Sequence, residues 1–150
     1  MLAELKTGGL FMFRNLLIAV DGSEHSVRAA KRAVALGQIM DDSNIEILYI
    51  LDGSKSKSDV LKYGDSDTAS LKRKEMLSEY ERMIGDAGIA HTTTILQGSP
   101  AETIIKHANE GNYDCLIIGS RGRSTVQTMI LGSVSHKVMK YVKAPVLMVK

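Results

Sequence analysis

The sequence predicts a single α/β domain in which a doubly wound parallel sheet carries helices on both faces. Three observations lead to this prediction. The chain has 150 residues, the length of one ordinary domain, and 44% of them are hydrophobic against 24% charged. Short uninterrupted apolar runs alternate with stretches in which apolar residues recur at helical spacing. Strands that alternate with helices form right-handed βαβ units, and these build a parallel sheet.

Composition excludes several classes of protein. No apolar run approaches the roughly 18 residues that span a bilayer, and the N-terminus lacks a signal-peptide pattern, so we expect a cytoplasmic protein. The single cysteine, Cys115, permits no intrachain disulfide, and its apolar neighbours predict a buried, inert thiol. The dispersed histidines lack the spacing of metal ligands, so we predict no metal site and expect them on the surface or in loops. They are His25, His91, His107 and His136.

The first part of the chain contains three predicted strands, two helices and one long loop. The strands are residues 16–20, 45–51 and 92–96. Asp21-Gly22-Ser23 ends the first strand as a turn and helix start, and the helix runs to about Met40. Residues 52–68 are rich in Ser, Lys, Asp and Gly and predict a long mobile loop. The helix that follows ends at Gly88.

The second part begins with a strong helix start at Ser99-Pro100-Ala101-Glu102. Ser99 can cap the helix, Pro100 fits its first position, and Glu102 completes a capping box. Gly111 ends this helix. The remaining elements are a strand at 115–118, a helix at 133–142 and a strand at 146–149. Residues 1–11 are predicted to be an N-terminal extension to a domain of residues 12–150.

Charge is distributed unevenly along the chain. The net charge is +2, but residues 119–150 carry six basic side chains and no acidic one, and the rest of the chain has a balance of −4. Such a field favours an anion near the C-terminal third. Aromatic residues are only 5% and no stacking series interleaves the charges, so a small phosphorylated ligand is favoured over nucleic acid. A solvated basic face is the alternative.

Two glycine turns mark the predicted site. Ligands of doubly wound folds bind beyond the carboxyl ends of strands, and Gly119-Ser120-Arg121-Gly122 directly follows a predicted buried strand. Ten residues on, Gly132-Ser133 opens the last helix. Glycines allow close backbone approach, and a helix N-terminus offers unpaired N–H groups with partial positive charge. With the hydroxyls of Ser133 and Ser135, these turns predict a phosphate cradle.

The pattern Gly119-x2-Gly122-x9-Gly132-Ser133 resembles the nucleotide-binding signature of the universal stress protein family, over about residues 12–150. Three further pieces match the family: Asn15-Leu16-Leu17-Ile18-Ala19-Val20-Asp21-Gly22-Ser23, Gly98-Ser99-Pro100-Ala101-Glu102 and Ala144-Pro145-Val146-Leu147-Met148-Val149. The resemblance implies a five-stranded parallel sheet, a homodimer through the C-terminal strand and, in one branch, bound ATP. Because this sequence keeps the glycines and the serine, the resemblance places it in the ATP-binding branch.

The family's ligand positions carry over to this sequence residue by residue. Asp21 would face the adenosine, and the backbone of Ile50 would meet the adenine edge. The remaining positions would line the ribose and phosphates: Gly119, Arg121, Gly122, Gly132, Ser133, Val134 and Ser135. ADP or AMP are alternatives to ATP, and Mg²⁺ would accompany ATP.

Several of these residues have a structural alternative. Asp21 could cap the first helix, Gly119 and Gly122 could serve the turn alone, and Ser135 could be a first-turn helix residue without a ligand. For Arg121 and Arg123 the alternative is that the side chain is simply exposed to solvent.

The sequence favours a non-enzymatic ATP-binding module in stress response or signalling, whose nucleotide alters a dimer or partner surface. The alternative is a slow ATPase or an autophosphorylating protein that uses the same site. A Walker lysine motif, a nucleophile elbow and a kinase catalytic loop are absent from the sequence. The first predicted strand is followed by Asp21-Gly22-Ser23-Glu24-His25-Ser26. This segment matches neither of the two motifs that adenylate-forming relatives carry at that place. It also lacks the Gly-x-Gly-x-x-Gly of dinucleotide oxidoreductases.

Overall fold

A computed structural model of the protein describes residues 13–52, 66–122 and 131–150. Within these ranges it contains five strands and four helices. In chain order they are β1 (Asn15–Val20), α2 (Glu24–Gly37), β2 (Asn44–Leu51), α4 (Ser66–Asp86), β3 (Ala90–Gln97), α5 (Pro100–Glu110), β4 (Cys115–Gly119), α6 (Ser133–Tyr141) and β5 (Val146–Val149). All neighbouring strands pair in parallel, which confirms the predicted five-stranded α/β fold.

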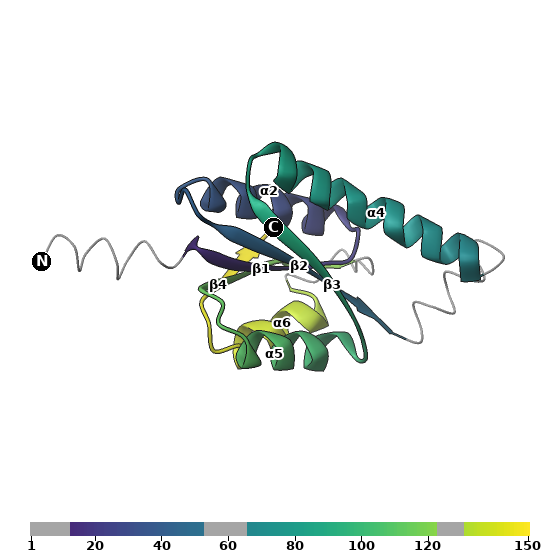
Figure 1. Ribbon diagram of the computed structural model, residues 1–150. Helices are drawn as coiled ribbons and strands as arrows, with labels where there is room; N and C mark the ends of the chain where they lie inside the picture. The colour runs from purple at the N-terminus through teal and green to yellow at the C-terminus, as the bar shows by residue number, and fades with distance from the viewer. Residues whose placement is uncertain (1–12, 53–65, 123–130) are drawn as a thin grey trace, which may run out of the picture.

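The strand order β3-β2-β1-β4-β5 makes this a doubly wound sheet. From β1 the chain first adds β2 and β3 on one side and then crosses to add β4 and β5 on the other. Helices α2 and α4 cover one face, and α5 and α6 cover the opposite face (Figure 1). The carboxyl ends of β1 and β4 therefore lie side by side where the winding direction reverses, which is where such folds place their ligands.

Alternation along each strand divides the apolar core between the two faces. Leu16, Ile18 and Val20 of β1 pack on the side of α2 and α4, while Leu17 and Ala19 pack on the side of α5 and α6. All five are buried. A continuous apolar run is what a central parallel strand needs, because both of its faces are covered.

The thiol of Cys115 is buried, as predicted, on the α2 and α4 side of the sheet. Burial raises its pKa, so the thiolate is disfavoured. In the described part of the chain no helix is long and apolar enough to cross a membrane.

Two predicted helix boundaries are wrong. Helix α2 ends at Gly37 and not near Met40: Gln38 makes the last helical bond, to the carbonyl of Val34, and the N–H of Ile39 then bonds the carbonyl of Leu36, only three residues back. Helix α4 begins at Ser66, inside the segment predicted as loop. Its first turns show little apolar periodicity, which is why the sequence did not indicate a helix there. Residues 53–65 of that segment, like the predicted extension at 1–11, lie outside the described residues.

The capping box predicted for α5 is also wrong. Ser99 is the N-cap and Pro100 opens the helix, as predicted, but the Ser99 side chain makes no capping bond to the backbone. Its hydroxyl instead hydrogen-bonds the carboxylate of Glu102 directly. This contact lowers the pKa of Glu102, helped by a backbone hydrogen bond and by the charge of Lys137.

Candidate functional site

The turn between β1 and α2 is held by three short-range hydrogen bonds. A carboxylate oxygen of Asp21 accepts the N–H of Ser23 at 2.9 Å, and the Ser23 hydroxyl accepts the N–H of Ser26 at 3.2 Å. The Ser26 hydroxyl in turn accepts the N–H of Asp21 at 3.1 Å. Gly22 lies inside this ring with a φ of 81°, which a residue with a side chain rarely adopts.

This geometry assigns the helix cap to Ser23 and not to Asp21. The alternative in which Asp21 merely caps the first helix is therefore wrong, although Asp21 does stabilise the turn through Ser23. Only one of its carboxylate oxygens makes that bond. The other, Oδ2, points toward the turn after β4.

Asp21 and Gly122 lie in direct contact. A Cβ atom placed on Gly122 would come within 2.7 Å of Asp21 Oδ2, which is closer than real Cβ contacts. A side chain at position 122 would have to displace this carboxylate, so the ends of β1 and β4 meet at this pair of residues. The structure thus brings together two positions that are 101 apart in the numbering.

The second glycine turn joins the first. The N–H of Gly132 donates to the carbonyl of Ser120 at 2.8 Å, and a Cβ on Gly132 would lie 3.5 Å from the Cα of Arg121 and 3.9 Å from the nitrogen of Gly122. The start of α6 is therefore held against the turn that follows β4. The predicted juxtaposition of the two glycine turns is present in the structure.

The N-terminus of α6 carries backbone donors that the helix itself does not use. Gly132 is the N-cap, and the first helical bond runs from the N–H of His136 to the carbonyl of Gly132. The N–H groups of Ser133, Val134 and Ser135 consequently have no partner within the helix, as at every helix start. These groups and the helix dipole favour a negative charge at this end.

The hydroxyl of Ser135 donates a hydrogen bond within the protein. Ser135 is buried, and its Oγ donates to the carbonyl of Gly119 at 2.7 Å. Its hydroxyl proton therefore stabilises the junction of β4 and α6, while its backbone N–H keeps the position described above. Ser133 is exposed, and Val134 packs against the core.

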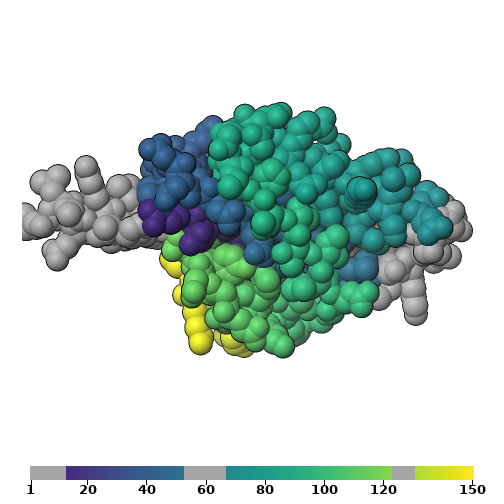
Figure 2. All heavy atoms as spheres, in the orientation of Figure 1, coloured from purple at the N-terminus to yellow at the C-terminus, as the bar shows by residue number. Residues whose placement is uncertain are grey.

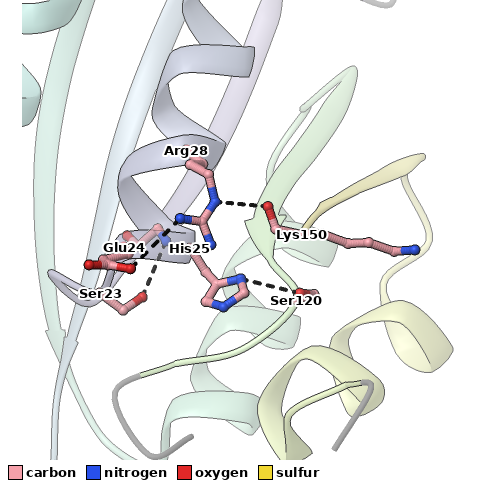
Figure 3. Close-up of polar contacts among 7 residues, drawn as sticks. Ser23, Glu24, His25, Arg28, Ser120 and Lys150 are labelled. Atoms are coloured by element: carbon pink, nitrogen blue, oxygen red, sulfur yellow. Dashed lines mark hydrogen bonds and ion pairs between the residues drawn. The ribbon is translucent and has the colours of Figure 1, made fainter. Parts of the chain in front are cut away.

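Gly119 is a packing glycine. A Cβ at this position would come within 2.8 Å of the backbone carbon of His25 in the first turn of α2. Neither Gly119, Gly122 nor Gly132 has a positive φ, so close approach, and not an unusual backbone conformation, explains each of them. The His25 ring lies beside Ser120, with 3.4 Å between Nδ1 and the serine Oγ (Figure 3).

Ile50 lies at the same edge of the sheet, on the other side of β1. The last pair between β1 and β2 is Val20 with Tyr49, so Ile50 is level with Asp21. Its side chain is buried in the core on the α5 and α6 side. Its backbone is therefore the part of this residue that could meet a ligand.

The basic residues of the C-terminal third are spread over several surfaces. Arg121 belongs to the cradle, whereas Lys137 pairs with Glu102 of α5 at 3.6 Å and Lys140 lies 5.3 Å from the ring centre of Tyr141. Arg123 is outside the described residues. In the folded protein these basic residues are therefore less concentrated near the candidate site than their clustering in the sequence suggests.

The sequence did not identify the core residues that hydrogen-bond the turn between β1 and α2. Tyr80 of α4 is buried, and its hydroxyl lies 2.9 Å from the Ser26 hydroxyl. Burial raises the pKa of Tyr80, while hydrogen bonds from Ser26 and the Gly22 backbone lower it in part. Only the fold could show which polar partner the Tyr80 hydroxyl meets, because the two residues are 54 positions apart.

A separate polar cluster lies at the opposite, amino end of the strands. Glu46 of β2 accepts hydrogen bonds from Tyr113 at 2.9 Å and from His107 of α5 at 2.5 Å. Burial and the Glu46 carboxylate raise the pKa of Tyr113. His107 is therefore a half-buried helix residue with partners, which corrects its prediction as a surface or loop histidine. In the described ranges no three His, Cys, Asp or Glu side chains gather in a way that could hold a metal ion.

A model of the universal stress protein family matches residues 12–150. The chain belongs to this family. Universal stress protein YxiE of Bacillus subtilis is 30% identical over 149 residues, which cover 93% of this chain and all of that one. The solved structure of the hypothetical protein MJ0577 is 28% identical and superposes with a TM-score of 0.78, covering 93% of this chain and 96% of the other.

Two solved structures of universal stress proteins contain adenine nucleotides. One is a complex with cAMP, 23% identical with a TM-score of 0.66 over 91% of this chain and 95% of that one. The other, from Arabidopsis thaliana, has AMP bound and is 18% identical with a TM-score of 0.66 over 91% of both chains. At these identities the likeness shows the shared fold alone.

Proposed function

We propose that this universal stress protein binds ATP at the edge where β1, β4 and α6 meet, and that it acts as a stress-response or signalling module. The observation that carries the proposal is the contact of three elements at the switch point of the sheet. The Asp21 carboxylate lies against Gly122, and Gly122 lies against the start of α6. A carboxylate, a glycine turn and a helix N-terminus suit the sugar and phosphate ends of one nucleotide.

The residues divide into two groups by the chemistry they offer. The Asp21 carboxylate accepts hydrogen bonds, as ribose hydroxyls or an adenine amino group require, and the backbone of Ile50 lies on the same side. The backbone donors of Ser133, Val134 and Ser135, with the close turn at Gly119, Arg121, Gly122 and Gly132, suit phosphate oxygens. The cAMP and AMP of the two structures above support an adenine nucleotide in this fold. ADP, AMP and an accompanying Mg²⁺ stay predictions, as does the cytoplasmic location.

We infer that the site binds ATP without fast turnover. The Ser135 hydroxyl donates to the Gly119 carbonyl, and the Ser23 hydroxyl accepts from Ser26, so neither is poised to attack a phosphate. Asp21 is the acidic side chain that the described cradle offers, and one of its oxygens already bonds the turn. A bound nucleotide would then act through the surface it stabilises.

We propose that this surface includes the edge strand β5. It ends the sheet, and Leu147 in its middle is exposed. An apolar edge strand without an internal proline or charge is a template for pairing, and pairing with its own copy gives a two-fold dimer. The nucleotide site is close to this edge, because the N–H of Ser120 bonds the carbonyl of Val149 at 2.7 Å.

Mass spectrometry of the protein purified without added nucleotide, followed by ATP calorimetry, tests the proposal. We expect a copurifying adenine nucleotide, and we expect Gly122→Ala to weaken ATP binding by about tenfold or more, because its methyl displaces the Asp21 carboxylate. Gly85→Ala is the matched control, since Gly85 lies in the last turns of α4 and a Cβ there would meet only the His91 ring at 3.4 Å, an ordinary contact. ATP that neither copurifies nor binds the unmodified protein would refute the proposed function.

A further inference from the structure

Tyr80 carries a hydroxyl into an otherwise apolar part of the core. It is 2% exposed and belongs to the apolar core between the sheet and helices α2 and α4. A buried hydroxyl is costly unless it is hydrogen-bonded, so its presence requires a partner. Its side-chain partner is Ser26, itself 3% exposed, at 2.9 Å, and the Gly22 backbone also hydrogen-bonds it.

Ser26 connects Tyr80 to the candidate site. Its hydroxyl accepts the backbone N–H of Asp21 at 3.1 Å, and its own N–H is capped by Ser23, which in turn donates its N–H to the Asp21 carboxylate. These bonds form a closed network in which every member constrains Asp21. Tyr80 is its member from a distant element, 54 positions from Ser26 in the sequence.

We propose that Tyr80 is a positioning residue that acts through Ser26 to hold the Asp21 carboxylate toward Gly122, and that it thereby sets the site's preference for a nucleoside over bare phosphate. The inference rests on the proposed function, in which Asp21 meets the nucleoside and the α6 N-terminus meets the phosphates. Helix α4 then contributes to ligand selectivity without touching the ligand. A core that only needed volume at this place would carry no hydroxyl.

The test uses Tyr80→Phe, with Ser26→Ala as a second variant and Tyr113→Phe as the matched control. Tyr113 also hydrogen-bonds a side chain, Glu46, but it lies at the amino end of the strands, away from the site. Calorimetry of each variant with ATP and with inorganic tripolyphosphate gives two dissociation constants. We expect Tyr80→Phe and Ser26→Ala to weaken ATP about threefold to tenfold and to leave tripolyphosphate unchanged. Tyr113→Phe should change neither.

A double-mutant cycle separates positioning from general loosening. In the Asp21→Ala background there is no carboxylate to misplace, so Tyr80→Phe should then have little further effect on ATP affinity. An equal loss in both backgrounds, or an equal loss for ATP and tripolyphosphate, would show a merely structural role and overturn the inference.

Amide hydrogen exchange in the nucleotide-free protein keeps the inference distinct from the proposed function. Tyr80→Phe should speed exchange at the N–H of Asp21 and of Ser23, and should leave helix α5 unchanged. Unchanged exchange at both amides would overturn the positioning role whether or not ATP binds. Faster exchange in a protein that binds no nucleotide would refute the proposed function, and with it the role in selectivity, while leaving Tyr80 as the residue that holds the turn.

Discussion

At the scale of single residues, the three glycines of the site do different work. Gly119 makes room for the backbone of α2, Gly122 makes room for the Asp21 carboxylate, and Gly132 has only ordinary contacts at its Cβ position. A sequence motif presents them as equivalent positions of one signature. In the structure Gly119 allows β4 to pack against α2, and Gly122 leaves space for the Asp21 carboxylate of the candidate site.

The first prediction follows from Gly119. A methyl group on this residue would approach the backbone of His25 to 2.8 Å, and backbone cannot move aside as a flexible side chain can. Gly119→Ala should therefore lower the free energy of unfolding by about 1–3 kcal/mol. Denaturant titration checks this, with Gly132→Ala as the control that should keep its stability. Wild-type stability of Gly119→Ala would contradict the packing role.

The second prediction concerns Asp21. Asp21→Asn keeps an oxygen that can accept the N–H of Ser23, whereas Asp21→Ala removes both the charge and this turn bond. If the carboxylate meets the nucleoside, Asp21→Asn should weaken ATP by about 1.5–3 kcal/mol with little change in melting temperature. Binding of tripolyphosphate should be unaffected. A variant that loses both ligands equally would assign Asp21 to the turn alone.

At the scale of elements, helix α5 shows which features of a helix can be predicted from its local residue types. Its start, its opening proline and its ending glycine were predicted correctly from residue type. The bond pattern at its start was not, because the hydroxyl of Ser99 has a choice between a backbone N–H and the carboxylate of Glu102. Residue types fix which groups are available at a cap, but the choice among them depends on local geometry.

The third prediction is a pH dependence at this helix start. The pKa of Glu102 is lowered in the folded protein, so its stabilising contribution is present above its ordinary pKa near 4.5 and is lost as the pH falls through the lowered value. Glu102→Gln should therefore lower the melting temperature at about pH 7, and this loss should shrink as the pH falls below 4.5. Glu110→Gln at the other end of α5 should not be destabilising at pH 7, because a negative charge opposes the dipole there. An effect of Glu102→Gln that persists in acid would contradict the assignment.

At the scale of the whole molecule, the two sheet edges lie on opposite sides. In Figure 2 the face toward the viewer is formed mainly by teal and green segments, the region of α4, β3 and α5, while yellow C-terminal residues appear at one margin. Strand β3 carries Thr92, Thr93 and Thr94, whereas β5 is Val-Leu-Met-Val. The apolar character of β5 therefore favours it over β3 as the pairing edge.

The fourth prediction is that the protein is a dimer through β5. Leu147 is 37% exposed, while Val149 is buried in the core, so the edge can be altered at Leu147 without damage to the fold. Leu147→Lys should convert a dimer to a monomer in analytical ultracentrifugation. Leu71→Lys is the matched control, because Leu71 is 56% exposed on α4, away from this edge. An unmodified protein that sediments as a monomer at micromolar concentration would refute the dimer.

The sequence predicted the sheet and its covering helices because the central strands are largely apolar runs and each helix has a cap, a stop or an apolar face. It predicted which turns would meet, since parallel strands end at a common edge. It did not predict the start of α4, where apolar periodicity is weak, or the role of Tyr80. Contacts such as that of Tyr80 with Ser26 join residues 54 positions apart, and no local pattern specifies them.

The position of β4 beside β1 has a consequence for the order of folding events. Asn15 and Asp114, which hydrogen-bond at this junction, are 99 positions apart, so the pairing closes the longest loop of the sheet and should form late. The candidate site is divided across that closure, with Asp21 on one side and Gly122 and Gly132 on the other. On the proposed function, a nucleotide therefore finds no complete site before this pairing has formed. It should slow unfolding and leave the refolding rate unchanged, so the ligand would lengthen the lifetime of the native state without guiding the chain toward it.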